Sequence, residues 1–278
     1  MRIDTLKTIA NAIATGADTV AAIDAAMVGE TGTDWVRYMA RLRDVAIDGV
    51  PRFSIFAEDG NGKLPFLAFS SLPGPGLCPG AGECLTFCYS FKAWRYPAAF
   101  CRMAQNAMLL RSPEGRAAIL SALDTFEPTS GTLDFRLYVD GDFHSVECVR
   151  EWFAAIADRP WLRAYGYSKS FFEILEAAQT VELPANYRLN LSSGHRHAAA
   201  TVDAMRSLSI TRGSFIAVSV GHKVSSSEHG TSAHNAVLRA AHGRKAFTCP
   251  GKCGSCTPSG HACGSQRFAG IDIIIAVH

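Results

Sequence analysis

The stretch that decides the fold is LDFRLYVDGDFHSVECVREWFAAIAD, residues 133–158. Its first seven residues, 133–139, form a run typical of a strand, and residues 145–158 have the apolar spacing of a helix. A short polar loop joins the two segments. The stretch therefore predicts one strand–loop–helix unit, the unit from which parallel sheets are built.

This unit repeats along the rest of the chain. The further strand-like runs are residues 64–70, 162–168, 187–192, 214–220 and 271–277, and the further helical runs are 170–180 and 198–209. Alternation at this spacing favours a parallel sheet of about six or seven strands. We predict an α/β protein with a partial or open parallel (β/α) barrel, similar in plan to a TIM barrel but incomplete.

The first 48 residues have a different pattern. TDWVRYMARLRDVAI, residues 33–47, places apolar side chains at helical spacing, and the segments before it are Ala-rich and amphipathic. Short strands are predicted at 52–56 and 64–70, around a DGNG turn at 59–62. We therefore expect an N-terminal helical extension, residues 1–48, and a barrel-like domain, residues 49–278, with cysteine-rich loops.

Composition limits the classes of function. The chain has 278 residues, 48% of them hydrophobic, and a net charge of +2. This balance is too even for a protein that coats nucleic acid. No apolar run reaches the roughly 18 residues of a membrane span, and the N-terminus lacks the apolar core of a signal peptide. We expect a cytoplasmic protein that contacts no membrane.

Nine cysteines in a chain without a signal peptide favour metal binding over disulfides. SLPGPGLCPGAGECLTFCYS, residues 71–90, contains Cys78, Cys84 and Cys88 directly after a predicted strand. A structural zinc would need a fourth ligand, for which Cys101 or His144 is available. The alternative is a [4Fe–4S] cluster with one iron open to a substrate or cofactor.

A second group of cysteines lies near the end of the sequence. TCPGKCGSCTPSGHAC, residues 248–263, contains Cys249, Cys253, Cys256 and Cys263. Four thiolates in one short loop suit a closed site, either a structural zinc or a fully ligated [4Fe–4S] cluster. The chain thus carries one or two clusters, with zinc as the alternative at Cys249–Cys263. The remaining Cys101 and Cys148 fit small core side chains better.

Polar residues follow most of the predicted strands. In parallel α/β folds the carboxyl ends of the strands share one edge, and ligands bind there. We therefore expect one pocket, lined by polar residues of successive loops. These residues are Asp140, Gly141, Asp142, Ser168, Lys169, Ser192, His195 and His222.

The ordered set of motifs resembles the phage gene-product-88 family over residues about 65 to 278. The motifs are LPGPGLCPGAGECLTFCYS, RLYVDGDFHS, AYGYSKS, LNLSSG, CPGKCGSC and IDIIIAVH. This resemblance implies a protein of phages and mobile elements, and it implies no particular activity.

A more distant similarity is to radical S-adenosylmethionine enzymes, which have a partial (β/α) barrel and a three-cysteine [4Fe–4S] loop after the first strand. The similarity includes Phe87 just before the third cysteine, although the cysteine spacing differs. It implies that S-adenosylmethionine is a candidate cofactor, and that residues 249–263 would hold an auxiliary cluster. The acidic segment at 140–143 would meet the cofactor's amino group.

These observations lead to the first functional hypothesis, an iron–sulfur enzyme of the radical S-adenosylmethionine type with an unidentified substrate and an external electron donor. Asp140, Asp142, Lys169, His195 and His222 would be its catalytic residues. The cofactor would be bound by Asp140, Gly141, Asp142, Ser168 and Ser192.

Two alternatives stay open at this point. The protein could hold only structural metal and bind nucleic acid without catalysis, through the basic segments at 192–197 and 241–245. It could also be an iron–sulfur enzyme that uses an open iron as a Lewis acid, without S-adenosylmethionine.

Overall fold

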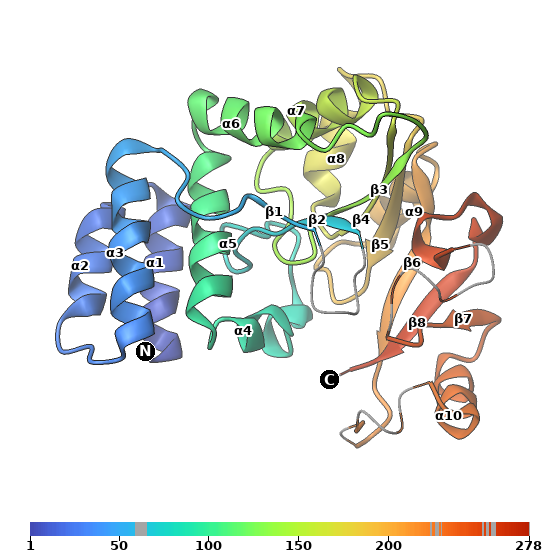
Figure 1. The fold of residues 1–278 in the computed structure, drawn as a ribbon. Helices are drawn as coiled ribbons and strands as arrows, with labels where there is room; N and C mark the ends of the chain where they lie inside the picture. Colours follow the sequence, from blue (N-terminus) through green and yellow to red (C-terminus); the bar gives the residue numbers. More distant parts are fainter. Residues whose placement is uncertain are drawn as a thin grey trace.

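The centre of the molecule is an eight-stranded sheet with the strand order β1-β2-β3-β4-β5-β6-β8-β7 (Figure 1). The computed structural model describes residues 1–58, 66–222, 224–225, 228, 230–251, 253, 256 and 260–277. β1 pairs with β2 in antiparallel orientation, and all other neighbouring strands are parallel. The predicted α/β class with a mostly parallel sheet is confirmed, and β1 and β7 form its two edges.

The predicted strand runs agree with most of the sheet. The strands are β1 (Phe56–Ala57), β2 (Leu67–Phe69), β3 (Leu133–Leu137), β4 (Leu162–Ser168), β5 (Tyr187–Ser192), β6 (Thr211–Val218), β7 (Ala246–Thr248) and β8 (Asp272–Ala276). The run at 52–56 is a correction, since it becomes strand only at its last residue. The predicted turn at 59–62 lies outside the described residues, and β7 had no predicted counterpart.

In the described residues, ten α-helices accompany these strands. They are α1 (Ile3–Thr15), α2 (Thr19–Met27), α3 (Thr33–Asp48), α4 (Ser90–Ala93), α5 (Pro97–Leu109), α6 (Pro113–Asp124), α7 (Val146–Ala157), α8 (Phe171–Ala177), α9 (Ala199–Arg206) and α10 (Ser232–His242). Ser112 and Ser145 cap α6 and α7 by accepting hydrogen bonds from backbone amides. Among the described residues, no helix has the length and apolarity that crossing a bilayer requires.

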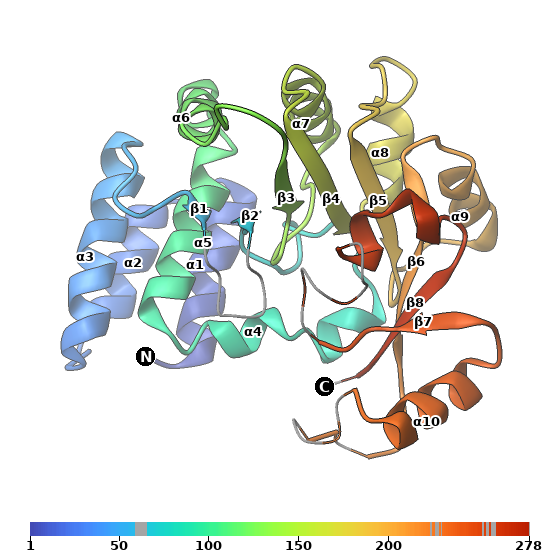
Figure 2. The same cartoon turned by 45° about the vertical axis from the view of Figure 1, so that its right-hand side comes forward.

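The two faces of the sheet have different surroundings because side chains alternate along each strand. On β3, Phe135 and Leu137 are fully buried and pack in one core with Trp152 and Phe153 of α7. The side chain between them, Arg136, is on the opposite face. Figure 2 shows helices α6, α7 and α8 in a row along one side of the sheet. The face that carries Arg136 is free of these helices.

The N-terminal helices form a second core together with α5. Leu6 of α1, Met39 of α3 and Phe100 of α5 are all buried in it. Met39 and Leu42 lie on the apolar face that the spacing of residues 33–47 predicts. The helices of residues 1–48 therefore pack on the rest of the chain through α5 (Figure 1).

Two isoleucines at equivalent helix positions test this division of core and surface. Ile156, next to last in α7, is fully buried, whereas Ile47, next to last in α3, is 59% exposed. Ile156→Ala should lower the free energy of unfolding by about 2–5 kcal/mol, because it leaves a cavity in the main core. Ile47→Ala should change it by less than about 0.5 kcal/mol. Urea unfolding followed by circular dichroism measures both values, and equal losses would contradict the assignment.

Candidate functional site

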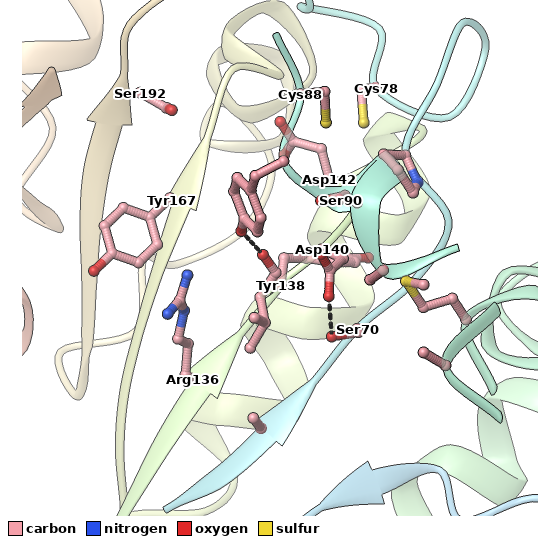
Figure 3. A pocket seen from close by; sticks show the side chains of 18 of the residues that line it. Ser70, Cys78, Cys88, Ser90, Arg136, Tyr138, Asp140, Asp142, Tyr167 and Ser192 are labelled. Atoms are coloured by element: carbon pink, nitrogen blue, oxygen red, sulfur yellow. Dashed lines mark hydrogen bonds between the residues drawn. The ribbon is translucent and has the colours of Figure 1, made fainter. Parts of the chain in front are cut away.

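One cavity of about 1220 Å³ lies on the face of the sheet opposite α6, α7 and α8. Arg136 of β3, Tyr167 of β4 and Phe215 of β6 line it, as expected for side chains that alternate toward one face. Residues that follow β2, β3 and β4 form its rim. Figure 3 shows Cys78, Cys88 and Asp142 together at this rim. The rim therefore lies at the edge where the sequence predicts a pocket, and the rest of the cavity extends along the face of the sheet.

The N-terminal cysteine loop is fixed to the rim by its backbone. The amides of Gly82 and Cys84 both donate to the carbonyl of Gly194, at 3.1 and 3.2 Å. The amide of Arg196 donates back to the Gly80 carbonyl at 3.1 Å. Gly80 has no room for a side chain, because a Cβ atom there would lie 1.5 Å from the carbonyl oxygen of Lys169. The loop after β2 is thus tied to the loops after β4 and β5.

All seven clustered cysteines line this one cavity. Cys78, Cys84 and Cys88 lie on its rim, whereas Cys249, Cys253, Cys256 and Cys263 come from the segment between β7 and β8. The other two cysteines are elsewhere: Cys101 is buried among the N-terminal helices, and the sulfur of Cys148 is 3.3 Å from the Tyr138 hydroxyl. The structure therefore brings together the two groups that the sequence separates by 160 residues.

The C-terminal cysteines lie against the strands of the sheet, below the rim. The carbonyl of Cys263 accepts a hydrogen bond from the Asn190 side chain at 3.0 Å. The neighbouring His261 is 3.6 Å from Asp134, near the start of β3, and its ring lies 4.4 Å from that of Tyr165. The cavity consequently has one group of thiols at its rim and the other against its floor.

Burial keeps several of these thiols protonated. It raises the pKa of Cys78, which the nearby Asp142 carboxylate raises further. It also raises the pKa of Cys249 to about 11 and that of Cys263 to about 12. A bound cation would remove this penalty, because it compensates the thiolate charge that the buried site disfavours.

The acidic loop after β3 begins with a strained residue. Tyr138 has a φ of 56°, in the left-handed region that a bulky residue rarely adopts. Its ring packs against Phe69 and Phe143, with ring centroids 5.6 and 5.1 Å away, and this packing holds the conformation. The next residues, Val139 to Asp142, line the cavity.

Asp140 and Asp142 have different environments. Asp140 accepts a hydrogen bond from the Ser70 hydroxyl at 3.1 Å and is partly exposed in the cavity (Figure 3). Asp142 is 5% exposed and accepts hydrogen bonds from the Ser168 hydroxyl at 2.6 Å and the Lys169 amide at 2.7 Å. Burial raises the pKa of Asp142 against the lowering effect of these donors. Asp140 is the carboxylate that a ligand can reach more easily.

The other predicted site residues divide into two sets. Gly141, Lys169 and Ser192 line the cavity, and the Lys169 ammonium donates to the Ser192 hydroxyl at 2.7 Å. Ser168 is buried behind Asp142. The structure therefore brings these four residues together with both aspartates and the rim cysteines at the rim of the cavity.

The two histidines predicted as site residues lie outside the rim of the cavity. The His195 ring packs against Phe171 at 4.8 Å, and its Nδ1 accepts a hydrogen bond from the His197 amide. His222 is 55% exposed and lies 3.4 Å from Glu228. Neither residue is among those that line the cavity in the described part of the chain. His195 instead belongs to the loop that holds the cysteine loop in position, through the bridge between Ala81 and His195.

Sequence reasoning missed four arginines that line the cavity, Arg41, Arg52, Arg102 and Arg136. Arg136 could have been found from its place among the apolar residues of a predicted central strand, where a charge is rare. Arg102 is on α5, and burial lowers its pKa while Asp140 raises it. No sequence pattern shows that α5 reaches the cavity.

Each cysteine group consists of electrostatic neighbours. Cys88 lies near enough to raise the pKa of Cys78 and Cys84, after the larger effect of burial. Cys253 and Cys256 have the same effect on Cys249. Within the described residues, however, no three His, Cys, Asp or Glu side chains form a group that could already hold a metal ion.

One comparison with known proteins gives a match. The family model described as Gene product 88 matches residues 54–270, which include both cysteine groups and the acidic loop. No curated protein and no solved structure gives a significant match.

Gly80 offers a test of how the cysteine loop is held. Gly80→Ala should detach the loop from Lys169, because the added methyl group cannot fit against a backbone carbonyl. Alkylation of Cys78 by iodoacetamide in the metal-free protein should then become faster, on the order of tenfold, since the thiol loses the burial that keeps it protonated. Peptide mass spectrometry measures the rate.

Gly32→Ala is the matched control, since a Cβ atom there meets only the flexible end of Glu30 and one ring atom of Trp35. The alkylation rate of Cys148, which is buried in a different part of the core, should stay the same in both variants. An unchanged rate at Cys78 in Gly80→Ala would show that the loop does not depend on this contact.

Proposed function

We propose that this chain, which belongs to the Gene product 88 family, is an iron–sulfur enzyme whose substrate cavity lies between two cysteine-ligated centres. The observation that carries this proposal is the convergence of all seven clustered thiols on one cavity. Structural cysteines need no such convergence, and Cys101 and Cys148 do not take part in it. A partial (β/α) barrel open on one side is the finer description of the fold that goes with this proposal.

The three rim cysteines have the donor chemistry for a [4Fe–4S] cluster with one open iron. Thiolates are the usual ligands of such clusters, and Cys78, Cys84 and Cys88 are held on one loop with a Gly-rich backbone. Binding would draw the three thiols around one centre, since metal ligation and local folding are coupled. Asp140, Lys169 and Ser192 line the same cavity and would face a molecule bound there.

The four floor cysteines have the number and type of ligands for a closed centre. Cys249, Cys253, Cys256 and Cys263 could complete a second [4Fe–4S] cluster, and the same set could hold zinc. We assign the second cluster because the site lies on the wall of the substrate cavity, where an electron carrier is useful. Electrons would come from an external donor protein.

The residues of the chain have separate tasks in this proposal. Asp140 would bind the amino group or ribose of S-adenosylmethionine, and the backbone at Gly141 would allow its close approach. Asp142 orients the Lys169 backbone and Ser168. A cluster held by Cys78, Cys84 and Cys88 would, when reduced by an external donor, supply the reductive cleavage of S-adenosylmethionine that starts radical chemistry on the substrate.

Cysteine variants test the assignment of two centres. After anaerobic reconstitution, the wild-type chain should contain about eight iron atoms and about eight acid-labile sulfides. Cys84→Ala and Cys256→Ala should each lose about half of both, because each removes a ligand from a different centre. Cys101→Ala is the matched control and should keep the full content.

The outcomes of this measurement separate the hypotheses. Half the iron in the wild-type chain, together with zinc that Cys256→Ala removes, would assign zinc to the floor site. A chain that takes up zinc alone and has no charge-transfer absorption would refute the proposal.

Cleavage of S-adenosylmethionine tests the radical chemistry separately. The dithionite-reduced wild-type protein should release 5′-deoxyadenosine, measured by liquid chromatography. Asp140→Asn should reduce this release about tenfold or more, since it removes a charged contact to the cofactor, and should keep the iron content. A fully loaded protein that releases none would favour the open iron as a Lewis acid without S-adenosylmethionine.

A further inference from the structure

Arg136 is a cation in the wall of the cavity between the two cysteine groups. Its guanidinium lies 4.7 Å from the centre of the Tyr167 ring, and its Nη1 is 4.0 Å from the sulfur of Cys253. Its Nε is buried and has no hydrogen-bond partner among the described residues. Figure 3 shows the side chain beside Tyr167, extended toward the rim.

The acidic residues around the cavity do not neutralise this charge. Asp140 accepts from Ser70, and Asp142 accepts from Ser168 and the Lys169 amide. Asp134, two residues before Arg136 on β3, pairs with Arg163 and His261. Within the described residues, no carboxylate forms an ion pair with Arg136. Arg136 is partly buried on a core strand and has no carboxylate partner there, so its retention points to a bound anion.

A second polar group near Arg136 also lacks a partner. Tyr165, directly opposite Arg136 in the pairing of β3 with β4, has a buried hydroxyl without a hydrogen bond in the described part of the chain. Both side chains line the cavity, and a hydroxyl and a guanidinium can donate to the same oxyanion. Lys169 and Arg102 add positive charge to the same cavity.

The surroundings of these two donors are apolar. Tyr167 and Phe215 lie in edge-to-face contact, with ring centroids 4.8 Å apart, and Phe247 and Ile273 complete this part of the lining. A ligand that satisfies Arg136 would therefore place its remaining atoms against aromatic and aliphatic side chains.

We propose that Arg136 and Tyr165 bind the oxyanion of a substrate, a carboxylate or a phosphate carried on an apolar or aromatic body. This proposal deepens the proposed function. It rests on that function for one point only, namely that the bound ligand is the substrate of an enzyme. The anionic end lies beside Cys253, and the body extends along Tyr167 and Phe215 toward the rim cysteines. Arg136 is a substrate-binding residue in this arrangement and takes no part in proton transfer.

Three small probes test the site by isothermal titration calorimetry on the reconstituted protein. Benzoate and phenyl phosphate carry the two oxyanions on the same aromatic ring, and benzamide is the neutral counterpart of benzoate. At least one oxyanion should bind, and benzamide should bind at least about tenfold more weakly than the tighter of the two oxyanions, because it lacks the charge. The tighter of the two oxyanions identifies the class of substrate.

Arginine variants assign the binding to this residue. Arg136→Gln should weaken oxyanion binding by about tenfold or more, whereas Arg136→Lys, which keeps the charge, should retain part of it. Arg206→Gln is the control, since Arg206 is an exposed residue of α9 paired with Asp203, and it should bind like the wild type. Iron content is measured on every variant.

Several outcomes would overturn the proposal. One is the failure of both oxyanions to bind. The second is a benzamide affinity equal to that of the tighter oxyanion, and the third is an unchanged affinity for that oxyanion in Arg136→Gln. Loss of half the iron in Arg136→Gln would assign the residue to the floor centre instead. Because the probes also apply to metal-free protein, oxyanion binding by a chain that takes up no iron would keep the anion site and refute only the iron–sulfur proposal.

Discussion

The cavity depends on one carbonyl group. The Gly194 oxygen accepts the amides of both Gly82 and Cys84, so two of the hydrogen bonds that fix the loop after β2 meet at one point after β5. These strands are not neighbours, since β3 and β4 lie between them. The loop must therefore cross the carboxyl edge of the sheet, and its crossing forms the rim. Backbone hydrogen bonds hold the rim thiols in position, and these bonds do not require contacts of the cysteine side chains.

The sequence predicts the strands of the sheet and its polar edge because both follow from local patterns. A buried parallel strand needs a short apolar run, and the loop after it is polar wherever it meets solvent or ligand. The sequence does not predict a strand where pairing with a distant segment, and not a local apolar pattern, defines that strand. β7 has only three residues, too few to show a period, and it is defined by its pairing with β8.

The histidines and the missed arginines show that the prediction of site residues from local sequence is limited in the same way. His195 follows a strand, as a cavity residue would, but Phe171 offers its ring an aromatic contact away from the cavity. Arg136 sits among apolar residues, and only the register of β3 shows that its side chain faces the cavity while its neighbours face α7. Residue type and spacing indicate which groups are available, and tertiary packing decides which of them meet.

The strand order of the last three strands has a consequence for how the protein is assembled. β8 lies between β6 and β7, although it follows both in the chain. Among the described strands, β7 pairs with β8 alone, so it joins the sheet only after β8 has been synthesised. The segment between these two strands carries the four floor cysteines. This wall of the cavity therefore forms only when a strand that follows all four cysteines in the chain has inserted beside β6.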